Sequence, residues 1–120
     1  MSYTNDMFER KILGEIKNHL GDDQAIILTG ARQTGKTTIL EQLNNYLTGI
    51  SEIVYFFTLE DPAILHALNE HPEKIFQFVR TGNKRIFLLL DEIQYLNNPS
   101  NFLKFMYDKY REKIKIIATG

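Results

Sequence analysis

The sequence predicts an α/β fold in which helices cover both faces of a parallel sheet. Four short runs are rich in apolar and β-branched residues, and the first of them, residues 24–29, lacks polar alternation and is expected to be a strand buried on both faces. Amphipathic helical patterns separate these runs, and strands that alternate with helices form parallel sheets. With 120 residues, of which 43% are hydrophobic, the chain has the size of one domain with one core.

The first expected element is an amphipathic helix over residues 5–20, where apolar residues recur three and four positions apart until Gly21. Residues 24–29 (QAIILT) predict the first strand, which Gly30 ends. A loop follows, and residues 36–47 then predict a second helix. Its apolar face consists of Ile39, Leu40, Leu43 and Leu47.

The second strand is predicted at residues 52–59 (EIVYFFTL), which are rich in β-branched and aromatic residues. We expect its aromatic side chains in the core rather than in a platform for stacked bases. Asp61 suits the N-cap of the next helix, with Pro62 at the first helical position. Two short helices are expected here, over residues 63–69 and 72–81.

The third strand is predicted at residues 85–90 (RIFLLL) and leads directly into Asp91. Asn98 and Pro99 repeat the cap-and-proline start for a helix that runs to about residue 110. Residues 113–118 (KIKIIA) predict the fourth strand. The chain shows no internal repeat or linker.

Charge and composition exclude several classes of function. The 14 basic and 15 acidic residues give a net charge of −1, which supplies no general attraction to nucleic acid or to an anionic membrane. Without cysteine there is no disulfide, thiolate metal site or cysteine nucleophile, and a reducing compartment, the cytoplasm, is expected. The longest apolar run, residues 86–90, is far shorter than the ~18–20 residues that span a bilayer, so neither a membrane anchor nor a signal peptide is expected.

The loop after the first strand carries a phosphate-binding motif. The pattern G-x-x-x-x-G-K-[ST] arises by chance in about 0.4% of chains of this length. It is formed here by Gly30, Ala31, Arg32, Gln33, Thr34, Gly35, Lys36 and Thr37. The glycines let the backbone approach phosphate oxygens, and N–H groups at the start of the helix point at the anion.

Three side chains of this motif have expected roles. Lys36 is expected to reach the β- and γ-phosphates as a point charge, and the Thr37 hydroxyl to ligate Mg²⁺. Thr38, the next helical residue, is expected to contact the α-phosphate or only to pack.

Two carboxylates follow the third strand. In parallel α/β sheets ligands bind at the carboxyl ends of the strands, which is where Asp91 and Glu92 are expected. Asp91 would hold Mg²⁺, usually through water, and Glu92 would orient and deprotonate an attacking water. Alone, this pair would be two solvated acids at a turn, but together with the loop it predicts a hydrolytic site.

Further segments accompany these motifs: Leu59-Glu60-Asp61-Pro62 at the end of the second strand, Leu90-Asp91-Glu92-Ile93-Gln94-Tyr95 after the third, and the terminal Ile117-Ala118-Thr119-Gly120. With the loop, they resemble the predicted AAA+ type ATPases of bacteria and archaea that pair an N-terminal ATPase domain with a C-terminal domain of unclear function. The loop and the Asp-Glu pair occur in many P-loop families. Arg32-Gln33, the Leu-Glu-Asp-Pro segment and Ile93-Gln94 narrow the choice.

The resemblance implies a three-layer P-loop NTPase fold with the strand order 2-3-4-1 and a fifth strand beyond the first. It implies that residues 1–120 are an AAA+ type ATPase domain cut after the fourth strand, whose partner is its own missing C-terminal region. Such a fragment would leave residues 24–29 at a sheet edge, and self-association is expected, by pairing at this edge or by exchange of the N-terminal helix. In this family the fourth strand leads to a polar residue that faces the γ-phosphate, which is Thr119 or lies beyond Gly120.

The predicted function is Mg²⁺-dependent ATP binding and hydrolysis, with ATP and Mg²⁺ as cofactors and Lys36 and Glu92 as catalytic residues. The alternative is a nucleotide-controlled interaction or DNA-handling module that binds ATP with little turnover. A GTPase would need an N-K-x-D segment, which the sequence Asn-Lys-Arg-Ile at residues 83–86 does not provide. A small-molecule kinase stays open, although Glu92 beside Asp91 favours water as the nucleophile.

Other polar residues carry weaker predictions. Arg32 is expected to touch a phosphate or to point into solvent, and Gln94 to orient Glu92 or water, or only to form a turn. The histidines lack metal-site spacing, so surface positions without zinc are expected for His19, His66 and His71. A basic stretch is expected to form a solvated face, with nucleic-acid contact as the alternative, at Lys109, Arg111, Lys113 and Lys115.

Overall fold

A computed structural model describes residues 3–30 and 35–120. In the first range, it describes the side chains of residue 7 and of residues 9–30. Its elements, with η for a 3₁₀-helix, are α1 (Tyr3–Asn18), β1 (Ile26–Leu28), α2 (Lys36–Gly49), β2 (Val54–Thr58), α3 (Pro62–Glu70), η2 (Pro72–Gln77), β3 (Ile86–Asp91), η3 (Ile93–Tyr95), α4 (Pro99–Tyr110) and β4 (Ile114–Thr119). No helix within these ranges is both long enough and apolar enough to cross a membrane.

The four strands form one parallel sheet in the order β1-β4-β3-β2. The strand order that the family resemblance implied is therefore confirmed. β1 pairs with β4 only through Ile26–Leu28, so it is shorter than the expected strand at residues 24–29. It lies at one edge of the described sheet, where Ile27 is 39% exposed. Self-association through this edge stays a prediction.

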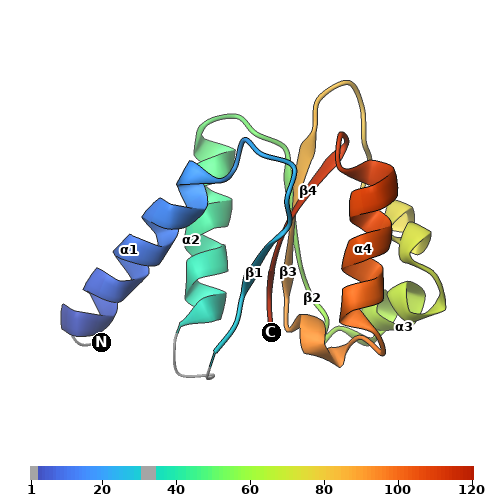
Figure 1. Cartoon of the computed structure of the whole chain (residues 1–120), viewed down its shortest axis with the longest axis horizontal. Coiled ribbons are helices and arrows are strands. Elements are labelled where there is room, and N and C mark those ends of the chain that lie inside the picture. The colour runs from blue at the N-terminus through green and yellow to red at the C-terminus, as the bar shows by residue number, and fades with distance from the viewer. Residues whose placement is uncertain (1–2, 31–34) are drawn as a thin grey trace.

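The sheet is the middle layer of three, as expected (Figure 1). Helices α1 and α2 cover one face, and α3, η2 and α4 cover the other. Neighbouring residues of β3 alternate between the two cores, because successive side chains of a strand point to opposite faces. Phe87 and Leu89 pack towards α1 and α2, whereas Leu88 and Leu90 pack towards α3 and α4.

Two of the helix starts follow the chemistry read from the sequence. The Asp61 carboxylate accepts a hydrogen bond from the N–H of Ala63 at 2.9 Å, and Pro62 is the first residue of α3. Asn98 accepts from the N–H of Asn101 at 3.0 Å, and Pro99 begins α4. Both caps are therefore confirmed.

The helix expected over residues 72–81 is wrong in length and type, because the chain forms only the six-residue 3₁₀-helix η2. Its start is capped by His71, whose Nδ1 accepts from the N–H of Glu73 at 3.1 Å. These two tight turns are enough to bury Ile75, and 3₁₀ geometry is common in such short pieces. The chain then extends to reach the start of β3 at Ile86.

The expected solvated basic face is also wrong at Lys115, which is completely buried. The reason is tertiary: β4 lies between β1 and β3, so both of its faces are covered. The ammonium group donates to the Asp22 carboxylate at 2.7 Å, to the carbonyl of Asp22 at 3.0 Å and to the carbonyl of Gln24. Lys115 thus holds the segment that leads into β1, and Lys109 and Lys113 remain exposed.

The contact between Lys115 and Asp22 predicts a pH effect on stability. A hydrogen bond from the Lys115 ammonium is the main cause that lowers the pKa of the Asp22 carboxyl from 3.8 to about 2. Because the pKa in the folded chain is the lower one, ionised Asp22 stabilises the fold fully above about pH 4, and this contribution is lost as the pH falls through about 2.

We expect Asp22→Asn to lower the free energy of unfolding at neutral pH and to flatten its decline between about pH 4 and about pH 2. Urea unfolding of the variant and the parent at a series of pH values measures both effects. Parallel pH profiles for the two proteins would contradict this role of Asp22.

Candidate functional site

The carboxyl ends of β1, β3 and β4 meet at one edge of the sheet. Leu28 at the end of β1 is opposite Thr119 at the end of β4, and Leu90 of β3 is opposite Ala118. The N–H of Gly120 donates to the carbonyl of Leu28 at 3.1 Å, which extends the pairing past the strand. The helix α2 begins at the same edge, with Lys36 eight positions after Leu28, the last residue of β1.

The N-terminus of α2 presents bare backbone. Its N-cap is Gly35, which has φ 75° and no side chain that could satisfy the first N–H groups of the helix. Gly30 also has a positive φ, 137°, in a region that other residues rarely adopt. The positive φ angles explain why glycine stands at both positions of the predicted motif, and the positive end of α2 would favour a bound anion.

Lys36 bridges the two ends of the loop. Its ammonium group donates to the carbonyl of Gly30 at 2.9 Å. This contact keeps the charge of Lys36 beside the loop, where a bound phosphate would meet it. Four predicted loop residues lie outside the described part of the chain: Ala31, Arg32, Gln33 and Thr34.

Asp91 lies at the centre of a hydrogen-bonded group that joins three elements. The Thr37 hydroxyl of α2 donates to Asp91 Oδ2 at 2.7 Å, and the Thr119 hydroxyl of β4 donates to Asp91 Oδ1. Asp91 is only 4% exposed, so these contacts compensate for the water that its carboxylate has lost. The structure thus brings the two predicted Mg²⁺ ligands, Thr37 and Asp91, into direct contact.

Thr119 also fixes Glu92. Its hydroxyl oxygen accepts from the Glu92 N–H at 3.2 Å while its proton is given to Asp91. Glu92 has a left-handed backbone, with φ 61° and ψ 47°, and it leaves the sheet at the start of η3. Its carboxylate accepts from Gln94 Nε2 at 2.8 Å.

The hydrogen bonds of this group do not include Thr38 or the three histidines. Thr38 is exposed on the first turn of α2. The three histidines are exposed, as expected. Within the ranges that the structure describes, no cluster of three or more His, Asp or Glu side chains is arranged to hold a metal ion.

Sequence reasoning missed one acidic residue at this site. Glu9 of α1 is 6% exposed, and its Oε2 lies 2.6 Å from the place where a Cβ on Gly35 would be. A carboxylate beside the N-terminus of α2 interacts favourably with the positive end of the helix. The available signal was spacing: Glu9 stands three, four and seven residues before Ile12, Leu13 and Ile16, so it lies on the apolar face of its helix.

The donor chemistry at Thr37 and Asp91 fits Mg²⁺. A hydroxyl and a carboxylate are hard oxygen ligands, and Mg²⁺ in nucleotide sites typically takes one or two protein oxygens together with phosphate oxygens and water. The two oxygens already lie within hydrogen-bond distance of each other.

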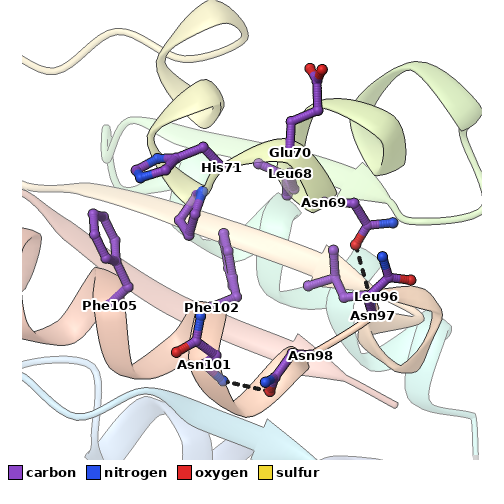
Figure 2. A pocket seen from close by; sticks show the side chains of 11 residues that line it. Leu68, Asn69, Glu70, His71, Leu96, Asn97, Asn98, Asn101, Phe102 and Phe105 are labelled. Atoms are coloured by element: carbon purple, nitrogen blue, oxygen red, sulfur yellow. Dashed lines mark hydrogen bonds between the residues drawn. The ribbon is translucent and has the colours of Figure 1, made fainter.

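A separate cavity of about 260 Å³ lies between α3 and α4 (Figure 2). Asparagine amides and the Phe102 and Phe105 rings line it. Two of these amides have structural roles, since Asn69 Oδ1 accepts from the Asn97 N–H at 2.9 Å and Asn98 caps α4. Asp91 and Glu92 do not line this cavity. The hydrogen bond between Asn97 and Asn69 in its wall holds the turn that follows these two acids.

The parallel sheet and the glycine-flanked loop at the start of α2 define a P-loop NTPase-like fold. The model of a protein family described as AAA domain matches residues 22–120, so the chain belongs to the AAA domain family. The family agrees with the class of ATPases that the motifs resembled.

One curated relative is the "Uncharacterized protein MJ1637" of Methanocaldococcus jannaschii, which is 36% identical over 122 residues. The match covers 96% of this chain and 24% of the relative, so the chain spans about a quarter of that protein's length. A crystal structure of a DNA replication initiation factor matches with a TM-score of 0.60 at 21% identity and covers 99% of this chain and 39% of that one. The structure of C. elegans PCH-2 matches with a TM-score of 0.49 at 17% identity, over 98% of this chain and 35% of that one.

The contacts of Thr119 predict a stability effect. Thr119→Val keeps the shape of the side chain but removes the donor to the buried Asp91 carboxylate and the acceptor for the part-buried Glu92 N–H. We expect a loss of about 1–3 kcal/mol in the free energy of unfolding, the usual cost of an unsatisfied buried polar group. Denaturant unfolding measures it, with Thr81→Val in the loop before β3 as the control. A variant as stable as the parent would contradict the bridging role.

Proposed function

We propose that this AAA domain binds ATP together with Mg²⁺ and hydrolyses it to ADP and phosphate. The observation that carries the proposal is the group formed by Thr37, Asp91, Thr119 and Glu92. It joins the N-terminus of α2, where the phosphates would bind, to the two acids at the end of β3. A protein that only needed a stable sheet edge would gain nothing from a buried carboxylate there, because burying that charge costs free energy.

Binding rests on fixed positive charge and backbone donors. The N–H groups at the start of α2 and the Lys36 ammonium would hold the phosphates, with Lys36 exchanging the carbonyl of Gly30 for the β- and γ-phosphate oxygens. The Asp91 carboxylate and the Thr37 hydroxyl would hold Mg²⁺. The bound ion would neutralise charge on the β- and γ-phosphates.

Hydrolysis rests on Glu92. Its carboxylate would orient an attacking water and take a proton from it as the water oxygen approaches the γ-phosphorus. Thr119 would keep the Glu92 backbone in its left-handed conformation and thereby aim the side chain away from the sheet. The proton of the Thr119 hydroxyl is used by Asp91, so this residue links the metal-holding acid to the base.

The binding half of the proposal is tested by Lys36→Ala. We expect the variant to lose most of its affinity for Mg²⁺·ATP, because the charge at the β- and γ-phosphates is removed while the core is untouched. Isothermal titration calorimetry measures the affinity, and circular dichroism checks the fold. Lys104→Ala, on the exposed face of α4, is the control and should bind as the parent does. Unchanged affinity in a folded Lys36→Ala variant would refute the loop assignment.

The catalytic half is tested by Glu92→Gln. We expect ATP binding to be retained and phosphate release to slow by ~10²-fold or more, since a general base contributes about 10²–10⁴ to the rate. The measurement is turnover at saturating Mg²⁺·ATP in the complete protein. Glu41→Gln, an exposed position on α2, should keep the parent rate.

The same pair of measurements separates an enzyme from a nucleotide-controlled switch. A parent protein that binds Mg²⁺·ATP tightly but releases phosphate no faster than the Glu92→Gln variant would be a binding module. Turnover that falls on Glu92→Gln without loss of affinity identifies the ATPase.

A further inference from the structure

Glu92 is held in a backbone conformation that few residues other than glycine adopt. Its φ of 61° is in the left-handed region, where the Cβ of an ordinary residue crowds the following carbonyl group. Such a conformation persists when its surroundings impose it. Here the Thr119 hydroxyl accepts a hydrogen bond from the Glu92 N–H, and the Glu92 carbonyl accepts one from the Tyr95 N–H at 3.2 Å. Both backbone groups of Glu92 are therefore fixed.

The side chain of Glu92 is held by Gln94. The amide Nε2 of Gln94 donates to Glu92 Oε2 at 2.8 Å. Hydrogen bonds to a carboxylate are stronger than those between neutral groups. One of the two carboxylate oxygens is thus engaged by a neighbour that is itself part of the turn.

The turn that carries Gln94 is anchored on both sides. Ile93 and Leu96 are buried, and the N–H of Asn97 is held by Asn69 Oδ1 from the end of α3 (Figure 2). On the other side, a Cβ on Gly120 would lie 2.8 Å from Gln94 Oε1 and 3.2 Å from the Gln94 nitrogen. The chain after β4 therefore packs closely on Gln94 and restricts where its amide can point.

From these contacts we infer that Gln94 is a positioning residue for Glu92, and that it affects ATP hydrolysis only through that carboxylate. The inference rests on the proposed function of Glu92 as the base. Gln94 restricts the rotation of the Glu92 side chain, so that the carboxylate is already oriented when water and nucleotide bind. Correct orientation of a catalytic group can account for a large share of a rate, and small displacements are costly.

A purely structural role for Gln94 predicts something different. If Gln94 only completed the turn, its replacement would lower the stability of the fold and leave turnover by the folded protein unchanged. The two roles are therefore distinguished by kinetics and not by stability alone.

The first experiment compares Gln94→Ala and Gln94→Glu with the parent, in the complete protein. Gln94→Glu has nearly the same shape but replaces the donor by a second carboxylate, which would repel Glu92. We expect kcat for phosphate release to fall about tenfold in Gln94→Ala and further in Gln94→Glu, with the Kd for Mg²⁺·ATP within about twofold of the parent value. Gln77→Ala, at an exposed position of the 3₁₀-helix η2, is the matched control and should leave kcat unchanged.

The second experiment asks whether Gln94 acts through Glu92. In a double-mutant cycle, two residues that act as one unit give effects that do not add. We expect Gln94→Ala to slow the parent but to cause no further loss in the Glu92→Gln background, measured as single-turnover phosphate release with enzyme in excess.

Three results would overturn the inference: kcat that is unchanged or raised in both Gln94 variants, a weakened Kd that accounts for the whole loss, or an equal loss from Gln94→Ala in both backgrounds. Failure of the proposed function has a separate signature. In that case Glu92→Gln itself would leave turnover unchanged, whatever the Gln94 variants do.

Discussion

The buried carboxylate of Asp91 is the constraint on which the arrangement of the site depends. A charge that is 4% exposed needs partners, and it finds them in Thr37 of α2 and Thr119 of β4. These hydroxyls come from positions 54 and 28 residues away in the chain. Satisfying one carboxylate therefore fixes the start of α2, the end of β3 and the end of β4 relative to one another, before any nucleotide is bound.

The opposite end of the sheet is held by cations. Lys115 is buried against the carbonyls of Asp22 and Gln24, and Arg85 donates to the carbonyl of Leu20 at 3.0 Å. These contacts hold the connection between α1 and β1, and so they hold β1 in register with β4. Because α2 and the predicted phosphate-binding motif follow β1 in the chain, the cations at one end of the sheet help to fix the strand from which this motif begins at the other end.

Much of the fold follows from local patterns. β3 and β4 were predicted from short runs rich in apolar residues, and α3 and α4 from an Asp or Asn cap followed by proline. These patterns depend on residues that are neighbours in the chain, so the elements can be predicted without knowledge of the tertiary structure. Lys115 shows the limit, since a lysine between charged neighbours is typical of a surface. Only the central position of β4 turns it inward, where three oxygens replace water.

The candidate site also has features that the sequence predicted and features that only the tertiary structure shows. The sequence by itself determined the phosphate-binding motif and the acid pair, because each is a short run whose chemistry depends on spacing along the chain. Only the tertiary structure decided that Thr119 bridges Asp91 and Glu92, that Gln94 holds the Glu92 carboxylate and that Glu9 lies against Gly35. The physical reason is that parallel strands bring their carboxyl ends together through long crossovers. Which polar groups meet there is set by strand order and register, which no local pattern of residues encodes.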